Sequence, residues 1–173
     1  PGPVEMAHDW AASARDHLDL TTHLGFDRFA VVGISIGGPY ILNLLKLAPQ
    51  RVVASVVMQT IGRDNNRQEF LAMFDGWADQ LHQSDPQRYG SEAMLGLRRR
   101  MFENDLTFMC MTESQVQELD APMLILDGAD TYHPAASSQR LAELQPQAER
   151  IHEWKLPPEL EVAADRVLGF FRD

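Results

Sequence analysis

A short apolar strand that passes straight into a helix through a glycine-flanked turn most limits how this chain can fold. Residues 28–33 (RFAVVG) form a β-branched run typical of a strand buried on both faces of a parallel sheet. The turn that follows, residues 33–37, reads G-x-S-x-G, and in this context the middle residue takes strained backbone angles. We therefore expect Ser35 to rise above the sheet edge, with Gly33 and Gly37 relieving clashes that a Cβ would cause.

Strands and helices alternate over most of the chain. Apolar residues recur every three or four positions in the predicted helices, and short apolar runs between turn residues mark the predicted strands. Tight connections between them favour right-handed strand–helix–strand units. The sequence thus predicts an α/β protein with a mostly parallel sheet flanked by helices, the helices spanning 6–24, 37–48, 137–144 and 160–171 and the strands 28–33, 51–58, 123–128 and 150–154.

The segment from residue 63 to residue 118 has a different character. It is rich in Met and Phe, keeps helical periodicity and contains no convincing strand. We expect it to be an inserted helical cap between a first part of the core at 1–62 and a second part at 119–173. The apolar stripe that includes Phe70, Phe74 and Trp77 is expected to pack as core before it lines any substrate pocket.

Composition excludes several classes of function. The 173 residues are 45% hydrophobic and 23% charged, which suits one globular domain with an inserted subdomain. Fifteen basic and twenty-five acidic residues give a net charge of −10, so we expect no nucleic-acid partner. The sequence has no run of about 18 apolar residues, which a membrane-spanning helix would need. We expect a cytoplasmic protein without membrane contact. Cys110 is the single cysteine and cannot form an internal disulfide.

Two other interpretations of the glycine-rich turn are open. Gly33, Ser35 and Gly38 nearly match the G-x-G-x-x-G pattern of dinucleotide-binding proteins. Against this, a serine replaces the middle glycine, and the next strand ends at Gln59 where that pattern needs an acid. Ser35 could also be a small residue in a tight turn with no chemistry.

Two blocks of the sequence resemble the α/β-hydrolase fold family. VVGISIGGPYILNLLKLAPQRV is similar to its nucleophile elbow, and APMLILDGADTYHP is similar to the block that carries its catalytic acid. The resemblance extends over nearly the whole chain and is to cap-bearing serine hydrolases. It implies that Ser35 is the nucleophile, that the Ile36 amide stabilises the oxyanion and that Asp130 is the acid, with no cofactor. The implied substrate is a small, mostly apolar ester or related molecule that passes through a covalent acyl-enzyme.

Asp130 also has support from its position, since α/β sheets place ligand chemistry at the carboxyl ends of their strands. Gly128-Ala129-Asp130 is equally ordinary in a plain turn. Asp127, Asp130 and His133 have a spacing that a metal could use, but nothing supplies a further ligand cluster, so we expect no metal.

The general base is the open question. In the family it is a histidine in the loop after the last strand, and here that loop, residues 154–159, has none. His133, three residues after Asp130, and His152 are the candidates. Without a base a serine hydroxyl is a weak nucleophile. The alternative function is therefore a catalytically impaired or non-catalytic protein that binds a small molecule.

The resemblance further implies several strands that would precede the first predicted helix. This sequence contains none of them, and we expect a truncated chain in which strand 29–33 has a bare edge. An open apolar edge pairs readily with other chains. A homodimer through this edge is therefore possible.

Overall fold

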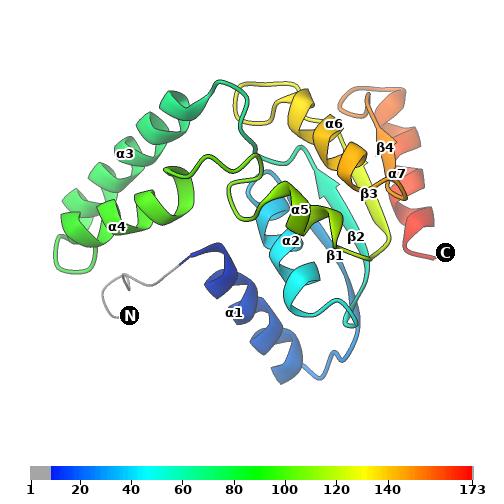
Figure 1. Cartoon of the computed structure of the whole chain (residues 1–173), viewed down its shortest axis with the longest axis horizontal. Helices are drawn as coiled ribbons and strands as arrows, with labels where there is room; N and C mark the ends of the chain where they lie inside the picture. Colours follow the sequence, from blue (N-terminus) through cyan, green and yellow to red (C-terminus); the bar gives the residue numbers. More distant parts are fainter. Residues whose placement is uncertain (1–8, 173) are drawn as a thin grey trace.

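Four parallel strands form one sheet in which spatial order follows chain order, β1-β2-β3-β4 (Figure 1). The structure, a computed structural model, describes residues 9–172. The strands are β1 (Phe29–Ile34), β2 (Val52–Met58), β3 (Met123–Leu126) and β4 (Glu149–Ile151). Ile34 pairs with Met58, Met58 with Leu126, and Leu126 with Ile151, so the carboxyl ends of all four strands meet at one edge. The predicted α/β class with a parallel sheet is confirmed.

The two faces of the sheet are covered by different helices. On one face, α1 (Trp10–His23), α2 (Gly37–Leu47), α5 (Glu113–Gln117) and α6 (Ala135–Leu144) share the main core with Val57 and Ile125. On the other face, α7 (Glu159–Phe170) packs Ala163 against Val56, Leu124 and Leu126. Side chains point alternately to opposite faces along a strand, which explains why neighbouring residues of β2 belong to different cores.

β1 is one of the two edge strands of the sheet within the described residues, and β4 is the other. The side chains of β1 alternate between half-buried and exposed, and Val32 and Ile34 are each 52% exposed. The expectation that this strand is buried on both faces is wrong. α7 packs over β2 and β3, so it leaves the same face of β1 uncovered in the described part of the chain.

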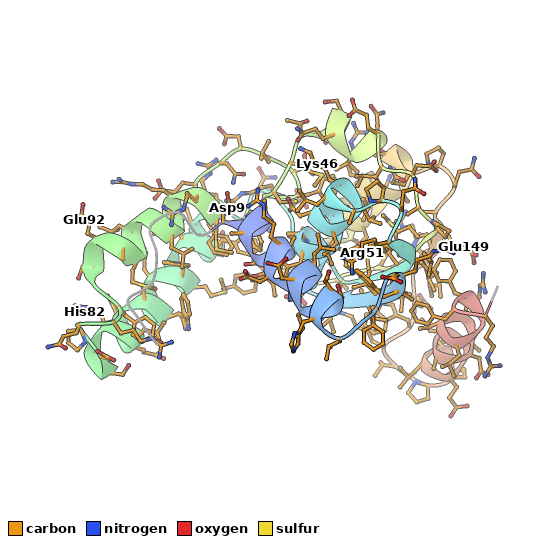
Figure 2. All side chains as sticks on the ribbon, turned by 90° about the horizontal axis from the view of Figure 1, so that it is seen from below. Asp9, Lys46, Arg51, His82, Glu92 and Glu149 are labelled. Carbon is orange, nitrogen blue, oxygen red and sulfur yellow. The ribbon has the colours of Figure 1, made fainter. Side chains whose placement is uncertain are left out.

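Two helices leave the sheet between β2 and β3. These are α3 (Arg67–Ser84) and α4 (Ser91–Phe102), which we call the cap helices. They project from the sheet on the side opposite to α7 in both views (Figure 1, Figure 2). They share a separate apolar cluster to which α1 contributes Trp10, whose indole Nε1 also donates to the Met101 carbonyl at 3.3 Å. The cap helices are therefore held to the core through α1 as well as through their own connections.

The segment predicted as a cap contains the cap helices but extends beyond them. Phe108, Met111 and Val116 lie near its end, and all three pack in the main core. Phe70 and Phe74 are buried in the apolar cluster of the cap helices, as expected for a stripe at helical spacing. The expectation is wrong for Trp77, which is 47% exposed and lines a cavity instead.

The ends of the elements differ from the predictions by a few residues. The predicted start of the first helix at Met6 lies outside the described residues, and α1 begins at Trp10. The last strand ends at Ile151, three residues earlier than predicted, because Trp154 turns back and its indole donates to the Asp127 carbonyl at 2.7 Å. Among the described residues, every helix is too short or too polar to cross a membrane.

Candidate active site

Ser35 lies in a strained turn between β1 and α2. Its φ of 58° is in the left-handed region, which is uncommon for a residue other than glycine. The Ser35 amide donates to the Met58 carbonyl at 3.0 Å, and its carbonyl accepts from the amides of Gly38 and Ile61 at 3.1 and 3.2 Å. The end of β2 and the first turn of α2 therefore hold the strained conformation in place.

The glycines around Ser35 have different reasons to be there. A Cβ on Gly33 would lie 2.8 Å from the Gly37 carbonyl oxygen and from Ile41 Cδ1, and one on Gly38 would lie 2.0 Å from Thr60 Oγ1. A Cβ on Gly37 would meet nothing within 4 Å. The expected clash is confirmed at Gly33 and wrong at Gly37, because the first turn of α2 borders an open groove beside β1.

His133 links Ser35 to Asp130. Its Nε2 lies 2.7 Å from Ser35 Oγ, and its Nδ1 lies 2.7 and 2.9 Å from the two carboxylate oxygens of Asp130. An ionised carboxylate can only accept, so a neutral imidazole donates from Nδ1–H to Asp130 and accepts the Ser35 hydroxyl proton at Nε2. The three side chains thus have the connectivity of a nucleophile, a base and an acid.

Asp130 and His133 belong to one tight turn, residues 130–133, which we call the acid–base turn. One carboxylate oxygen of Asp130 accepts the amides of Tyr132 and His133, both at 3.0 Å. A Cβ on Gly128 would lie 2.0 Å from the His133 carbonyl oxygen, so only glycine allows the chain to enter the turn this way. Partial burial acts to raise the pKa of Asp130, but the hydrogen bonds from His133 and Tyr132 outweigh it and hold this pKa below its ordinary value. Asp130 is therefore ionised at neutral pH.

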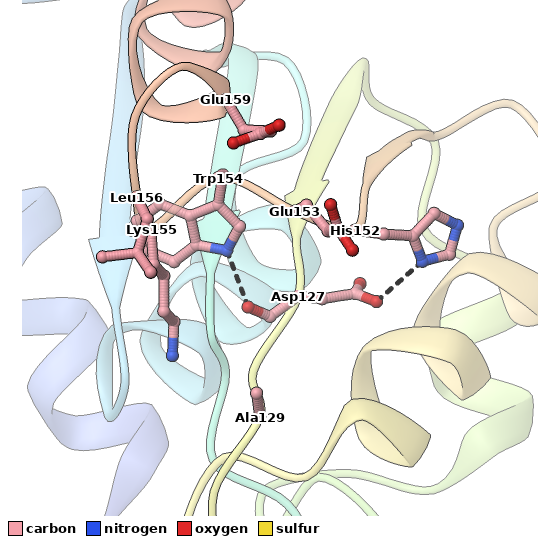
Figure 3. A pocket seen from close by; sticks show the side chains of 8 residues that line it. All are labelled: Asp127, Ala129, His152, Glu153, Trp154, Lys155, Leu156 and Glu159. Carbon is pink, nitrogen blue, oxygen red and sulfur yellow. Dashed lines mark hydrogen bonds and ion pairs between the residues drawn. The ribbon is translucent and has the colours of Figure 1, made fainter.

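His152, the other candidate base, lies with Asp127 instead. Its Nδ1 is 3.0 Å from Asp127 Oδ2, and its side chain is 67% exposed (Figure 3). Asp127 is buried and also accepts two hydrogen bonds of 2.8 Å from Arg150. The structure therefore brings together Ser35, Asp130 and His133, and it assigns His152 to a buried carboxylate at the end of β3.

Asp127, which the sequence offered only as a metal candidate, anchors the loop after β4. It binds Arg150 and His152 through its carboxylate and Trp154 through its carbonyl. Within residues 9–172, no group of three or more His, Cys, Asp or Glu side chains could hold a metal ion.

An apolar cavity of about 480 Å³ is lined by Ile36, the residue that follows Ser35. Its walls come from the start of α2, from Ser13 of α1 and from the cap helices. Much of the lining is aromatic or sulfur-containing, including Tyr40, Phe74, Trp77, Met101 and Phe102. Pockets of this size and character suit a small apolar ligand.

No protein-family model matches the chain. Its structure is similar to the α/β hydrolase MGS-M2 from a Medee basin deep-sea metagenome library, with a TM-score of 0.70, 15% identity, and coverage of 96% of this chain and 73% of that one. It is similar to 2-hydroxy-6-oxo-6-phenylhexa-2,4-dienoate hydrolase from Rhodococcus sp. strain RHA1, with a TM-score of 0.69, 17% identity, and coverage of 100% and 74%. It is also similar to Est816, an N-acyl homoserine lactone degrading enzyme, with a TM-score of 0.63, 20% identity, and coverage of 95% and 75%. The parallel sheet, the strained serine turn and these likenesses together show that the chain has the α/β-hydrolase fold.

Proposed function

We propose that the chain is a serine hydrolase that cleaves a small, mostly apolar ester or related substrate through a covalent acyl-enzyme. The observation that carries this proposal is the unbroken hydrogen-bonded path from Ser35 through His133 to Asp130. The order nucleophile, acid, histidine along the chain is also the order found in α/β-hydrolases.

The first half of the reaction forms the acyl-enzyme. Ser35 Oγ bonds to the substrate carbonyl carbon while its proton moves to His133 Nε2, and Asp130 stabilises the imidazolium that results. The carbonyl oxygen becomes an oxyanion beside the Ile36 amide at the positive end of α2. The carbon–oxygen bond to the leaving group then breaks, and His133 donates its Nε2 proton to the departing alcohol.

The second half releases the acid. A water molecule gives a proton to His133 Nε2 as its oxygen attacks the acyl carbon. The bond from that carbon to Ser35 Oγ then breaks, and His133 returns the proton to the serine. Over the two halves, one proton moves from Ser35 through His133 to the alcohol, and one moves from water through His133 back to Ser35.

The cavity supports the apolar substrate class. Ile36 carries the proposed oxyanion amide and also lines the cavity, which supports binding of the acyl group there during the reaction. Trp77 and Phe102 face this space from the cap helices. The similarity to an N-acyl homoserine lactone degrading enzyme is in line with a carbonyl substrate.

The competing proposal is a non-catalytic small-molecule binder. It is favoured by the loop after β4, residues 154–159, which has no histidine where the family carries its base. Such a protein would retain the apolar cavity but would not activate Ser35.

A fluorophosphonate probe separates the two proposals. The hydrolase is expected to react once per molecule, with the label on Ser35 in the mass spectrum, and Ser35→Ala is expected to abolish labelling. Ser84→Ala, at an exposed position at the end of α3, is the matched control and should react like the wild type. A folded wild-type protein that stays unlabelled would favour the binder.

A further inference from the structure

We infer that Asn66 is a positioning residue through which the cap holds the acid–base turn against Ser35. The inference rests on the proposed function, because it assigns Asn66 a role in the same reaction. Asn66 directly precedes α3, where the chain leaves the core for the cap helices.

The side chain of Asn66 is used for tertiary contacts rather than for its own helix. Asparagine at this N-cap position ordinarily accepts an amide from the first turn of its helix. In the described structure Asn66 makes no such bond, although it is only 3% exposed. Its Nδ2 donates to the carbonyls of Gly62 at 2.9 Å and Thr131 at 2.7 Å, and its Oδ1 accepts the Asp64 amide at 3.2 Å. Thr131 lies inside the acid–base turn.

The acid–base turn needs such an external anchor. The hydrogen bonds of Asp130 to Tyr132 and His133 fix the imidazole relative to the carboxylate. They do not fix it relative to Ser35, which lies on a different turn at the end of β1. A displacement of about 1 Å between reacting groups can cost about 10²-fold in rate. The contacts that join the acid–base turn to the rest of the molecule therefore control whether His133 reaches the serine.

A second contact comes from the same part of the cap. Phe70, one helical turn after Asn66, packs edge-to-face on Tyr132 of the acid–base turn, with ring centroids 5.2 Å apart. Phe70 also stacks on Phe102 at 5.8 Å, and Phe102 lines the apolar cavity. The start of α3 thus touches the acid–base turn on one side and the wall of the proposed substrate cavity on the other.

The segment that carries Asn66 packs closely on α6. A Cβ on Gly62 would lie 2.1 Å from Ser137 Oγ, so the backbone at Gly62 packs directly on the first turn of α6. α6 begins immediately after the acid–base turn. Asn66 therefore donates to Thr131 from a backbone that is fixed against the helix following the same turn.

The test uses two substitutions at Asn66 and one matched control. Asn66→Ser removes both N–H donations, and Asn66→Asp keeps the shape of the side chain but has no N–H to donate. Asn104→Ser is the control, because Asn104 also donates to a carbonyl, that of Met109, and accepts a nearby amide, that of Leu106. Its bonds do not reach the acid–base turn.

The readouts are the rate constant and final stoichiometry of fluorophosphonate labelling, with kcat and KM for p-nitrophenyl butyrate. In both Asn66 variants, the labelling rate constant and kcat are expected to fall at least about tenfold. KM is expected to change less than about twofold, and labelling is still expected to go to completion. Asn104→Ser is expected to stay within about twofold of the wild type in every readout.

Three results would overturn the inference. Wild-type rate constants in both Asn66 variants would show that the contact does not position His133. A lower labelled fraction with an unchanged rate constant would show that Asn66 only stabilises the fold. If the wild type is not labelled at all, the proposed function fails first and the inference falls with it.

A measurement on the wild type covers the case in which neither Asn66 variant folds. Hydrogen exchange followed by mass spectrometry compares peptides from residues 64–72 and 128–136. The inference expects the two peptides to open together, with the same free energy. An acid–base turn that stays protected while residues 64–72 exchange freely would contradict it.

Discussion

His133 Nε2 lies 2.7 Å from Ser35 Oγ, although 98 residues separate them in the sequence. The contact exists because β1 and β3 end at the same edge of the sheet, so the turns that follow them face each other. The proposed base therefore lies on the same turn as the proposed acid. In this arrangement a single peptide segment carries two of the three proposed catalytic groups.

The first prediction separates the two histidines. His133→Gln is expected to lower kcat/KM for p-nitrophenyl butyrate by about 10²–10⁴-fold, because Ser35 loses the general base that takes its proton. His152→Gln is the control and is expected to change kcat/KM less than about threefold, since His152 contacts Asp127. Steady-state kinetics of both variants measures this difference. A larger loss in His152→Gln than in His133→Gln would reverse the assignment of the base.

The second prediction concerns the stability contributed by Asp130 as the pH changes. Its pKa is lower in the folded chain than in the unfolded chain, so its ionised form stabilises the fold above its ordinary pKa. This contribution is expected to disappear as the pH falls below about 4 and through the lowered pKa. Urea unfolding at pH 6 and pH 3 should therefore show a smaller difference between wild type and Asp130→Asn at pH 3. The exposed Asp120, changed to Asn, serves as the control, and a difference that grew toward pH 3 would contradict the prediction.

The third prediction compares neighbouring glycines on α2. Gly38→Ala is expected to lower the free energy of unfolding by about 1–3 kcal/mol, because the new Cβ would overlap Thr60 Oγ1. Gly37→Ala is expected to leave this free energy unchanged or raise it by up to about 1 kcal/mol, since its Cβ meets open space and alanine favours a helix. Chemical denaturation of the two variants measures both values. Equal losses would show that the turn needs glycine at position 37 for another reason.

The fourth prediction tests the apolar cavity as the binding site for the acyl group. Trp77 lines the cavity from α3 and remains partly exposed. Trp77→Ala is expected to raise KM for p-nitrophenyl hexanoate about fivefold or more, because roughly 1 kcal/mol of apolar contact is lost with the longer chain. KM for p-nitrophenyl acetate should change little. Trp154→Phe is the control, because Trp154 lines a different pocket.

The fifth prediction concerns the edge of β1. The exposed Val32 and Ile34 are expected to let two copies of this chain associate along the edge, in a concentration-dependent way. Val32→Lys is expected to weaken this association, since a charged side chain on an edge strand opposes pairing. Sedimentation velocity over a range of concentrations tests the prediction. A wild-type chain that remains a monomer throughout would refute it.

Much of the fold could be predicted from local patterns. The apolar runs at β2 and β3 predict buried strands because both faces of these strands are covered. The same reasoning failed at β1, whose composition is that of a buried strand although it lies at the edge among the described residues. The pattern of apolar residues shows which faces of a strand could be buried, whereas the neighbouring strands and helices determine which faces are buried.

Some features of the candidate site could likewise be predicted from local patterns, and others could not. Local residue patterns are enough to place Ser35 and Asp130, because each follows a strand that those patterns identify. The folded chain is needed to show that His133 rather than His152 reaches Ser35, that Gly37 faces open space and that Asn66 binds Thr131. These relationships join residues from separate elements or depend on packing around them, and they follow from how the helices and turns pack on the sheet rather than from the residues nearby in the chain.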